Sequence, residues 1–138
     1  MKPSITYLHL LAKTPFFIKL TRAQLKWVID HSKEWDVTQG TLITSSDGDP
    51  NSIWVLLDGG WQIETGSTKY AIGHGDPGNW YGGPAVHAAS AASRLVASEP
   101  SYVMEMRMAD FDDMVKRGFD FNQDLRMGVQ FYLDVLKV

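Results

Sequence analysis

The stretch IWVLLDGGWQI, residues 53–63, decides the class of fold. It opens with a continuous apolar run at 53–57, which is typical of a β-strand buried on both faces. The sequence WQI at 61–63 begins a second run of strand character. Between the two runs, DGG at 58–60 combines residues that readily adopt positive φ angles. This stretch therefore predicts two buried strands joined by a tight hairpin turn.

Short strand-like runs continue on both sides of this stretch. They cover residues 41–44, 69–72, 94–98 and 102–108, and turn residues separate them. Connections this short leave no room for a helix between parallel strands, so antiparallel sheets are expected. The predicted fold class is mainly β with flanking helices: a double-stranded β-helix, or jelly-roll, that forms a β-roll over residues 37–108.

Helical patterns precede and follow the expected β-roll. Short N-terminal helices are predicted within residues 4–32, where Thr21 and Gln24 have the spacing of a capping box. Two C-terminal helices are predicted over residues 109–138. Because no linker interrupts the sequence, residues 1–138 are expected to form one domain.

The composition limits the partners that the chain can have. Of its 138 residues, 13 are basic and 16 acidic, and the formal charge of -3 creates no positive field that would favour nucleic acid or an anionic membrane. The absence of cysteine excludes disulfides, thiol nucleophiles and cysteine-bound zinc. The sequence has neither a secretory signal pattern nor an apolar run of about twenty residues that would span a bilayer. We therefore expect a cytoplasmic protein that binds neither nucleic acid nor membrane by itself.

The last predicted helix, which begins near Asn122, carries apolar residues around more than half of its circumference. Packing on its own domain does not cover that much apolar surface, so the second face is expected to meet a partner. A two-fold pair of such helices is the commonest arrangement and predicts a homodimer. The alternative is a terminal helix that lies in a groove of its own domain. The expected interface consists of Leu125, Val129, Phe131, Tyr132, Val135 and Leu136.

Several segments together resemble one known family. They are TPFFIKLTRAQL at 14–25, the stretch at 53–63, GDPGNWYGG at 75–83, RLVASEPSYVMEM at 94–106 and ADFDDMV at 109–115. In this order they resemble the cyclic-nucleotide-binding domains of the catabolite-activator and protein-kinase-regulatory type. The resemblance implies a β-roll with a phosphate-binding cassette, and a ligand that acts by allostery on the helices after the roll.

Two positions depart from the family's cassette. The family reads phenylalanine, glycine and glutamate, followed a few residues later by an arginine that pairs with the phosphate. Here Tyr81 and Gly82 match the first two residues. Gly83 stands in place of the glutamate, and Ala91 stands in place of the arginine. Enclosing a phosphate without a cationic partner costs on the order of several kcal/mol, so we expect that cyclic AMP does not bind in the usual way.

Other groups in this region remain candidates for binding a cyclic nucleotide or another small anionic ligand. Gly82 and Gly83 allow a ligand to approach the backbone, and Pro84 suits the first position of a short helix through Ala88, whose amides are expected to face a pocket. Arg94 is the nearest cation and a candidate direct ligand. The alternative is that Arg94 is a strand residue whose side chain lies in solvent. The alternative for the whole region is a remnant turn that binds nothing. The candidate ligand residues are Trp80, Tyr81, Gly82, Gly83, Pro84, Ala85, Ser90, Ser93 and Arg94.

Two other patterns of binding residues are incomplete. GHGDPG at 73–78 has the glycine spacing of a dinucleotide loop, but no helix follows it, so a turn between strands explains it. His74, Asp76 and His87 surround the cassette, but the closely spaced histidine pair of a cupin metal site is missing. We therefore expect no metal, no cofactor and no catalytic residue.

These observations lead to one hypothesis and two alternatives. The chain is expected to be a non-enzymatic sensor or regulatory domain, with a cassette altered enough to accept a ligand other than cyclic AMP, or none. It ends at Val138 without a DNA-reading helix-turn-helix segment, so its output is expected to go to a partner protein. The alternatives are a purely structural protein-interaction domain and a cupin-like metal-dependent enzyme.

Overall fold

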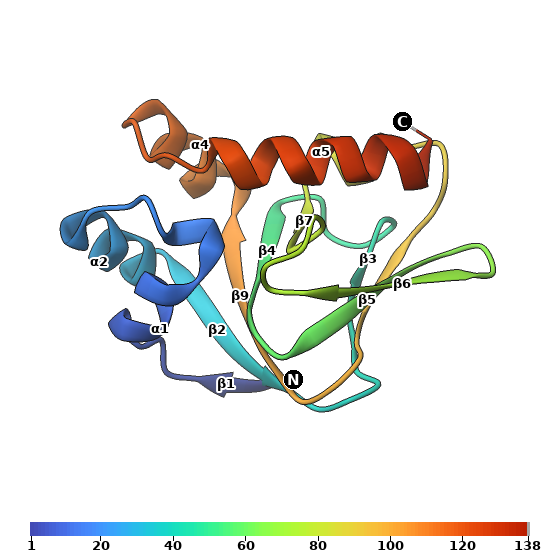
Figure 1. Cartoon of the computed structure of the whole chain (residues 1–138), viewed down its shortest axis with the longest axis horizontal. Helices are drawn as coiled ribbons and strands as arrows, with labels where there is room; N and C mark the ends of the chain where they lie inside the picture. Colours follow the sequence, from blue (N-terminus) through green and yellow to red (C-terminus); the bar gives the residue numbers. More distant parts are fainter. Residues whose placement is uncertain (138) are drawn as a thin grey trace.

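Two antiparallel sheets form the body of the protein (Figure 1). The structure is a computed structural model that describes residues 1–137. Its five-stranded sheet has the order β1-β2-β9-β4-β7, and its four-stranded sheet has the order β3-β8-β5-β6. This architecture confirms the prediction of a mainly β roll with flanking helices. In chain order the strands are β1 (Lys2–Ser4), β2 (Ser32–Val37), β3 (Leu42–Ser45), β4 (Ser52–Asp58), β5 (Gly60–Thr65), β6 (Thr68–Gly73), β7 (Trp80–Gly82), β8 (Arg94–Ala97) and β9 (Ser101–Arg107).

The helices lie on one side of the roll and along its top edge in Figure 1, where α1 and α2 neighbour β2 and α5 runs past the strand ends. The predicted capping box is confirmed, because Thr21 Oγ1 accepts from the Gln24 N–H (3.2 Å) and Gln24 Oε1 accepts from the Thr21 N–H (3.0 Å). In the part of the chain that the structure describes, no helix is both long and apolar enough to cross a membrane. The helices are α1 (Leu8–Lys13), the short 3-10 helix η1 (Pro15–Phe17), α2 (Arg22–Asp30), α3 (Pro84–His87), α4 (Met108–Lys116) and α5 (Asn122–Leu136).

The turn at residues 58–60 leads from one sheet to the other. β4 pairs with β7 and β9, whereas β5 pairs with β6 and β8. Gly59 adopts a φ of +88°, and a Cβ at this position would collide with Ser101 at the start of β9. The Ser101 hydroxyl also accepts a hydrogen bond from the Gly60 N–H over 3.0 Å. The prediction of two buried strands is therefore confirmed, but the predicted hairpin is wrong, because the two strands find their partners in different sheets.

The roll begins earlier than residue 37, and a strand precedes the N-terminal helices. β1 pairs with β2 through Lys2 opposite Asp36 and Ser4 opposite Glu34, and β2 itself starts at Ser32. Pro3 cannot donate to a strand ladder, so this strand has no clear sequence pattern. An edge position tolerates a proline, which is where β1 lies in the five-stranded sheet.

Buried phenylalanines join the helices into one cluster. The rings of Phe16 and Phe121 stack with centroids 5.0 Å apart, and Phe111 lies 6.3 Å from Phe16. Phe17 meets Phe121 edge-on at 6.1 Å. η1, α4 and the residue before α5 therefore share one core. This cluster fixes the point where α5 begins, and thereby the course of α5 past the region of the predicted ligand site.

Candidate functional site

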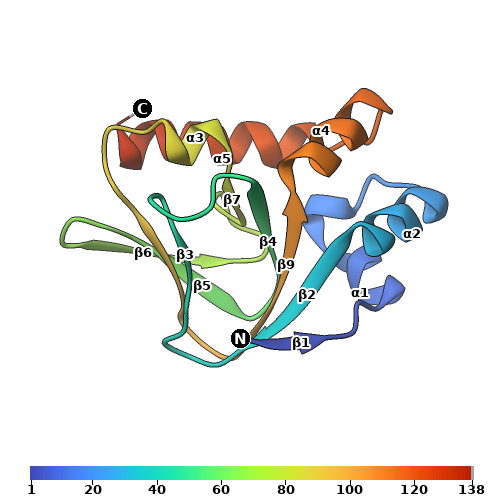
Figure 2. The same ribbon diagram turned by 180° about the vertical axis from the view of Figure 1, so that it is seen from behind.

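The cassette, defined here as residues 80–94, runs from β7 through α3 to the start of β8. Figure 2 shows α3 beside α5, close to the point where β7 ends. The sequence predicts a ligand pocket in this segment. Whether its polar groups are free or already paired therefore decides what the cassette can bind.

The backbone geometry of the roll accounts for both glycines of the cassette, and close packing accounts for Gly82 alone. Gly82 has a φ of +137°, and a Cβ there would lie 2.6 Å from the carbonyl oxygen of Ser52 on β4. Gly83 has a φ of +67°, and a Cβ there would lie 3.6 Å from the terminal carbon of Met108. Glycine adopts both conformations at little steric cost. The close approach that Gly82 permits is therefore an approach of β7 to β4.

The amides of α3 are used within the helical turn. The N–H groups of Val86 and His87 donate to the Gly83 carbonyl over 3.1 and 3.0 Å, and the Ala88 N–H donates to the Pro84 carbonyl over 3.1 Å. Pro84 has no N–H to offer. The prediction that these amides face a ligand is therefore wrong for Val86, His87 and Ala88, because each already has a backbone acceptor.

Tyr81 and Ser93 satisfy each other inside the roll. Tyr81 Oη lies 2.7 Å from Ser93 Oγ and donates to the Ser93 carbonyl over 3.3 Å, and both residues are buried. The Ser93 N–H donates to Ser46 Oγ, and the Ser46 N–H donates to the Ser93 carbonyl, each over 2.9 Å. His87 Nδ1 lies 2.8 Å from the Ser46 carbonyl. This network joins the cassette to the end of β3 and occupies two of the predicted ligand groups.

The buried tyrosines of this region keep their protons. Burial raises the pKa of Tyr81 to about 12, and the hydrogen bond with Ser93 offsets part of the rise. Burial also raises the pKa of Tyr132 well above its usual range. The Tyr132 hydroxyl donates to the carbonyl of Trp80. Both phenols are therefore neutral hydrogen-bond donors near pH 7, and neither is suited to act as a base.

Trp80 is a docking residue for α5. Its Nε1 donates to the Asp124 carbonyl over 2.9 Å, and its ring meets that of Tyr132 edge-on with centroids 5.3 Å apart. Gly128 leaves the space for the indole, because any Cβ at this position would overlap the ring. Trp80 is only 3% exposed. The side chain that the sequence places in the wall of a pocket is thus fully engaged by the last helix.

The loop after α3 is bonded to the end of α5. The Ala91 N–H donates to the Leu136 carbonyl over 3.2 Å. Leu136 belongs to the last helical turn, whose carbonyl groups find no N–H donor within the helix and need donors from elsewhere. Ala91 is also the position at which the family resemblance places the phosphate-pairing arginine. This contact therefore connects the cassette directly to the C-terminal helix.

The remaining candidate ligand residues lie at the surface. Arg94 is opposite Glu64 in the β5–β8 ladder, and its guanidinium lies 3.3 Å from the Glu64 carboxylate. The next three residues of β8 are buried whereas Arg94 is exposed, which favours the interpretation of Arg94 as a solvated strand residue. Pro84 and Ser90 are exposed, and Ala85 is half-buried.

The residues of the predicted dimer interface differ in their burial on α5 and fall into three groups. Tyr132 and Leu136 are fully buried within the chain, so their assignment to an interface is wrong. They face the cassette instead, through the contacts described above. Val129 is 41% exposed, and Leu133 on the same side of α5 is 42% exposed. The other three predicted residues pack partly against the core: Leu125, Phe131 and Val135.

The loop at residues 73–78 closes on itself. The Asp76 carboxylate accepts from the Gly73 N–H over 2.8 Å, and Asn79 Nδ2 donates to the His74 carbonyl over 2.9 Å. These bonds agree with a glycine turn between strands. Among residues 1–137, no three His, Asp or Glu side chains are placed together so that they could hold a metal ion.

No family model and no curated protein matches this sequence. Solved structures do match it. PKAR CBD2 with Sp-2Cl-cAMPS bound is similar over 96% of this chain and 90% of its own, with a TM-score of 0.69 and 15% identity. A protein from Geobacter metallireducens described as cyclic nucleotide-binding is similar over 96% of this chain and 99% of its own, with a TM-score of 0.66 and 22% identity.

A third similar structure is the regulatory subunit of a cAMP-independent protein kinase A from Trypanosoma brucei. It matches 81% of this chain and 45% of its own length, with a TM-score of 0.58 and 17% identity. Together these structures show that the chain has the fold of cyclic-nucleotide-binding domains, and they confirm the resemblance drawn from the sequence segments. At identities of 15% to 22% they establish the fold alone.

Proposed function

We propose that this chain is a non-enzymatic regulatory domain that transmits the state of its cassette to α5, and that it binds neither cyclic AMP nor cyclic GMP in the manner of nucleotide-binding members of the fold. The observation that carries the proposal is the hydrogen bond from the Ala91 N–H to the Leu136 carbonyl (3.2 Å). It supports a direct mechanical link at the position where the resemblance places a phosphate contact. Any displacement of the loop after α3 must move or release the end of α5.

Three further features support the part of the proposal that concerns cyclic nucleotides. The cassette lacks the arginine and the glutamate of the family at Ala91 and Gly83. The hydroxyl groups of Tyr81 and Ser93 are bonded to each other, and Arg94 is engaged by Glu64. A buried phosphate would therefore lack a cationic partner. One structure of similar fold belongs to the regulatory subunit of a kinase described as cAMP-independent, which is compatible with regulation that does not use this nucleotide.

Calorimetric titration of the whole chain with cyclic AMP and with cyclic GMP tests the nucleotide part of the proposal. We expect no binding heat at micromolar concentrations of either nucleotide, since the compensation for the phosphate charge is missing. Micromolar binding of either one would overturn this part.

Hydrogen exchange tests the coupling between the cassette and α5. Ala91→Pro removes the N–H that donates to the Leu136 carbonyl, and we expect faster amide exchange in the last turn of α5. Ala91→Gly keeps the N–H and serves as the matched control. Unchanged exchange in the last turn of α5 of the Ala91→Pro protein would contradict the proposed link. Exchange in β4 and β9 reports whether the variant has kept the roll.

We also propose that two copies associate through the outer face of α5. Val129 and Leu133 lie one helical turn apart and are 41% and 42% exposed, so together they form an apolar stripe that residues 1–137 leave uncovered. A two-fold axis along this stripe would bury it against itself. Light scattering is expected to give the mass of a dimer, and Val129→Asp with Leu133→Asp a monomer, whereas Gln130→Asp on the polar side should leave the dimer intact. A wild-type monomer at high concentration would overturn the proposal.

A further inference from the structure

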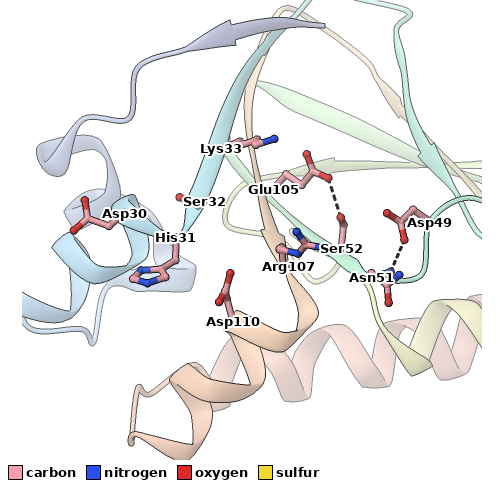
Figure 3. A pocket seen from close by; sticks show the side chains of 10 residues that line it. All are labelled: Asp30, His31, Ser32, Lys33, Asp49, Asn51, Ser52, Glu105, Arg107 and Asp110. Atoms are coloured by element: carbon pink, nitrogen blue, oxygen red, sulfur yellow. Dashed lines mark hydrogen bonds between the residues drawn. The ribbon is translucent and has the colours of Figure 1, made fainter.

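A cleft outside the cassette gathers charged side chains from two strands, two helices and the loop before β4. It lies where β2 begins, β9 ends and β4 begins, between the end of α2 and the start of α4 (Figure 3). Its volume is about 370 Å³, within the range of about 300–1,000 Å³ that is typical of small-molecule sites. None of residues 80–94 lines it.

The floor of the cleft is a fixed polar row on one face of the five-stranded sheet. Lys33 is directly opposite Glu105 in the β2–β9 ladder, and Ser52 is directly opposite Arg107 in the β4–β9 ladder. Glu105 is immobilised because it accepts from Ser52 Oγ over 2.8 Å and from Trp35 Nε1 over 3.2 Å. One carboxylate oxygen is thus held by β2 and the other by β4, where Figure 3 shows the bond to Ser52. The row is therefore preorganised by the strands.

The two cations of the cleft have no carboxylate partner. Among residues 1–137 the ion pairs are Arg94 with Glu64 and Arg117 with Asp113. Neither Lys33 nor Arg107 takes part in one, and both side chains are exposed to solvent. A guanidinium and an ammonium on neighbouring strands are suited to donate hydrogen bonds to the two oxygens of a carboxylate.

Acidic side chains surround this pair of cations. Asp110, in the first turn of α4, points into the space between His31 and Arg107 (Figure 3). Asp30 at the end of α2 and Asp49 before β4 also line the cleft. With Glu105, the cleft has four carboxylates and two cations. A purely anionic ligand such as a nucleotide is disfavoured by this balance, whereas a ligand with one carboxylate and additional positive charge is complementary to it.

We propose that this cleft binds a free basic α-amino acid, with the ligand carboxylate on Arg107 and Lys33 and its cationic groups on Asp110 and the neighbouring acids. This inference rests on the proposed regulatory function and gives that function a class of ligand. Arg107 is the last residue of β9 and Asp110 lies in α4, so a ligand that bridges them would tie the roll to the helix that leads into α5. The exposed cations are well solvated, so the dissociation constant is expected to be on the order of 10⁻⁴ M or weaker.

Calorimetry or NMR titration of the whole chain with L-arginine tests the inference. Agmatine carries the same cationic groups without a carboxylate, and L-glutamate carries a net negative charge, so both are expected to bind at least about tenfold more weakly. Arg107→Gln and Asp110→Asn are each expected to weaken L-arginine binding by about tenfold or more. Arg94→Gln removes a guanidinium from the other sheet and should leave L-arginine affinity unchanged.

Three results would overturn the inference. The first is the absence of L-arginine binding at millimolar concentrations. The second is an equal loss of affinity in Arg94→Gln and Arg107→Gln, which would indicate a general charge effect. The third is equal affinity for agmatine and L-arginine, which would exclude the carboxylate contact. Each result leaves the exchange experiment on Ala91 and Leu136 unaffected, so a failure of the amino acid site is distinguishable from a failure of the regulatory proposal.

Discussion

Gly128 on α5 lies so close to the indole of Trp80 on β7 that a Cβ at position 128 would overlap the ring. The same indole donates from Nε1 to the Asp124 carbonyl over 2.9 Å, one turn earlier on the helix. These two contacts set both the distance and the register of α5 relative to the cassette. α5 therefore packs on the roll in one position, and substitutions at this contact are expected to change the stability of the protein.

Gly128→Ala is expected to lower the free energy of unfolding. Alanine favours a helix interior by about 1 kcal/mol over glycine, but overpacking against Trp80 costs about 1–3 kcal/mol, and the rigid ring cannot move aside as a flexible side chain would. Urea unfolding followed by circular dichroism measures the difference. Arg126→Ala, at an exposed position of the same helix, is the control and should change stability by less than about 0.5 kcal/mol. A Gly128→Ala protein as stable as the wild type would show that α5 packs less tightly against Trp80 than the structure indicates.

Stability is expected to fall between pH 10 and pH 12. The pKa of Tyr81 is about 12 in the folded chain and 10.0 when the residue is not buried. The protonated hydroxyl therefore favours folding below pH 10, and this contribution to stability is lost as the pH rises through the folded-state pKa. One such group changes the free energy of unfolding by up to about 1.4 kcal/mol per pH unit. Urea unfolding at several alkaline pH values should therefore give a shallower pH dependence for Tyr81→Phe.

Tyr7→Phe is the matched control for this pH dependence, because Tyr7 is 53% exposed. It should reproduce the wild-type slope between pH 10 and pH 12. Equal slopes for Tyr81→Phe and the wild type would contradict the assignment of the buried hydroxyl.

Glu34→Gln is expected to stabilise the protein at neutral pH. Glu34 on β2 is 4% exposed, and its Oε2 has no hydrogen-bond partner among the described residues. Desolvation raises the pKa of this carboxyl above 4.5, and a hydrogen bond with Thr6 offsets part of the rise. A raised folded-state pKa means that the group favours folding at pH values below 4.5 and loses this contribution as the pH rises through the folded value.

The neutral amide removes the buried charge, so the Glu34→Gln protein should be more stable than the wild type by about 1 kcal/mol at pH 7. The gain should shrink toward pH 4, where the wild-type carboxyl is protonated. Asp36→Asn, a half-buried position on the same strand, provides the comparison. A gain that is independent of pH would mean that the charge of Glu34 is not its cause.

Thr21→Ala is expected to destabilise the protein by about 1 kcal/mol, since it removes the side-chain acceptor of the Gln24 N–H at the start of α2. Thermal unfolding measures the effect. Arg22→Ala, at the first residue of α2, keeps the cap and should have a much smaller effect. Similar losses in both variants would attribute the change to the helix surface and not to the capping box.

Features that depend on neighbouring residues are predictable from this sequence. The capping box can be recognised from the spacing of Thr21 and Gln24 alone. The buried strand at 53–57 can be recognised from its continuous apolar run. The DGG turn marks a change of direction, but it does not say which partners the two strands choose. The order of strands in the sheets depends on segments far apart in the chain, such as the pairing of β4 with β9. For that reason the turn is predictable and the sheet change is not.

The candidate site divides in the same way. The losses at Gly83 and Ala91 follow from a local motif. The contact found at Ala91 does not follow from a local motif. The hydrogen bond from Ala91 to Leu136 joins a loop and a helix end that are far apart in the sequence. Gly128 is the one available signal, because a glycine within a helical pattern often marks a close approach by another element. The charged cleft at Arg107 gives no such signal, since its residues come from strands, helices and a loop that are separate in the sequence.

Gly82 matters for how proteins of this architecture are classified. Its backbone faces the Ser52 carbonyl, and this contact is made by protein atoms alone. A pattern search that rewards this glycine therefore scores scaffold geometry. The charged groups of the family's cassette depend on which residues stand at positions 83 and 91, so a domain can match the pattern closely and still lack those charges.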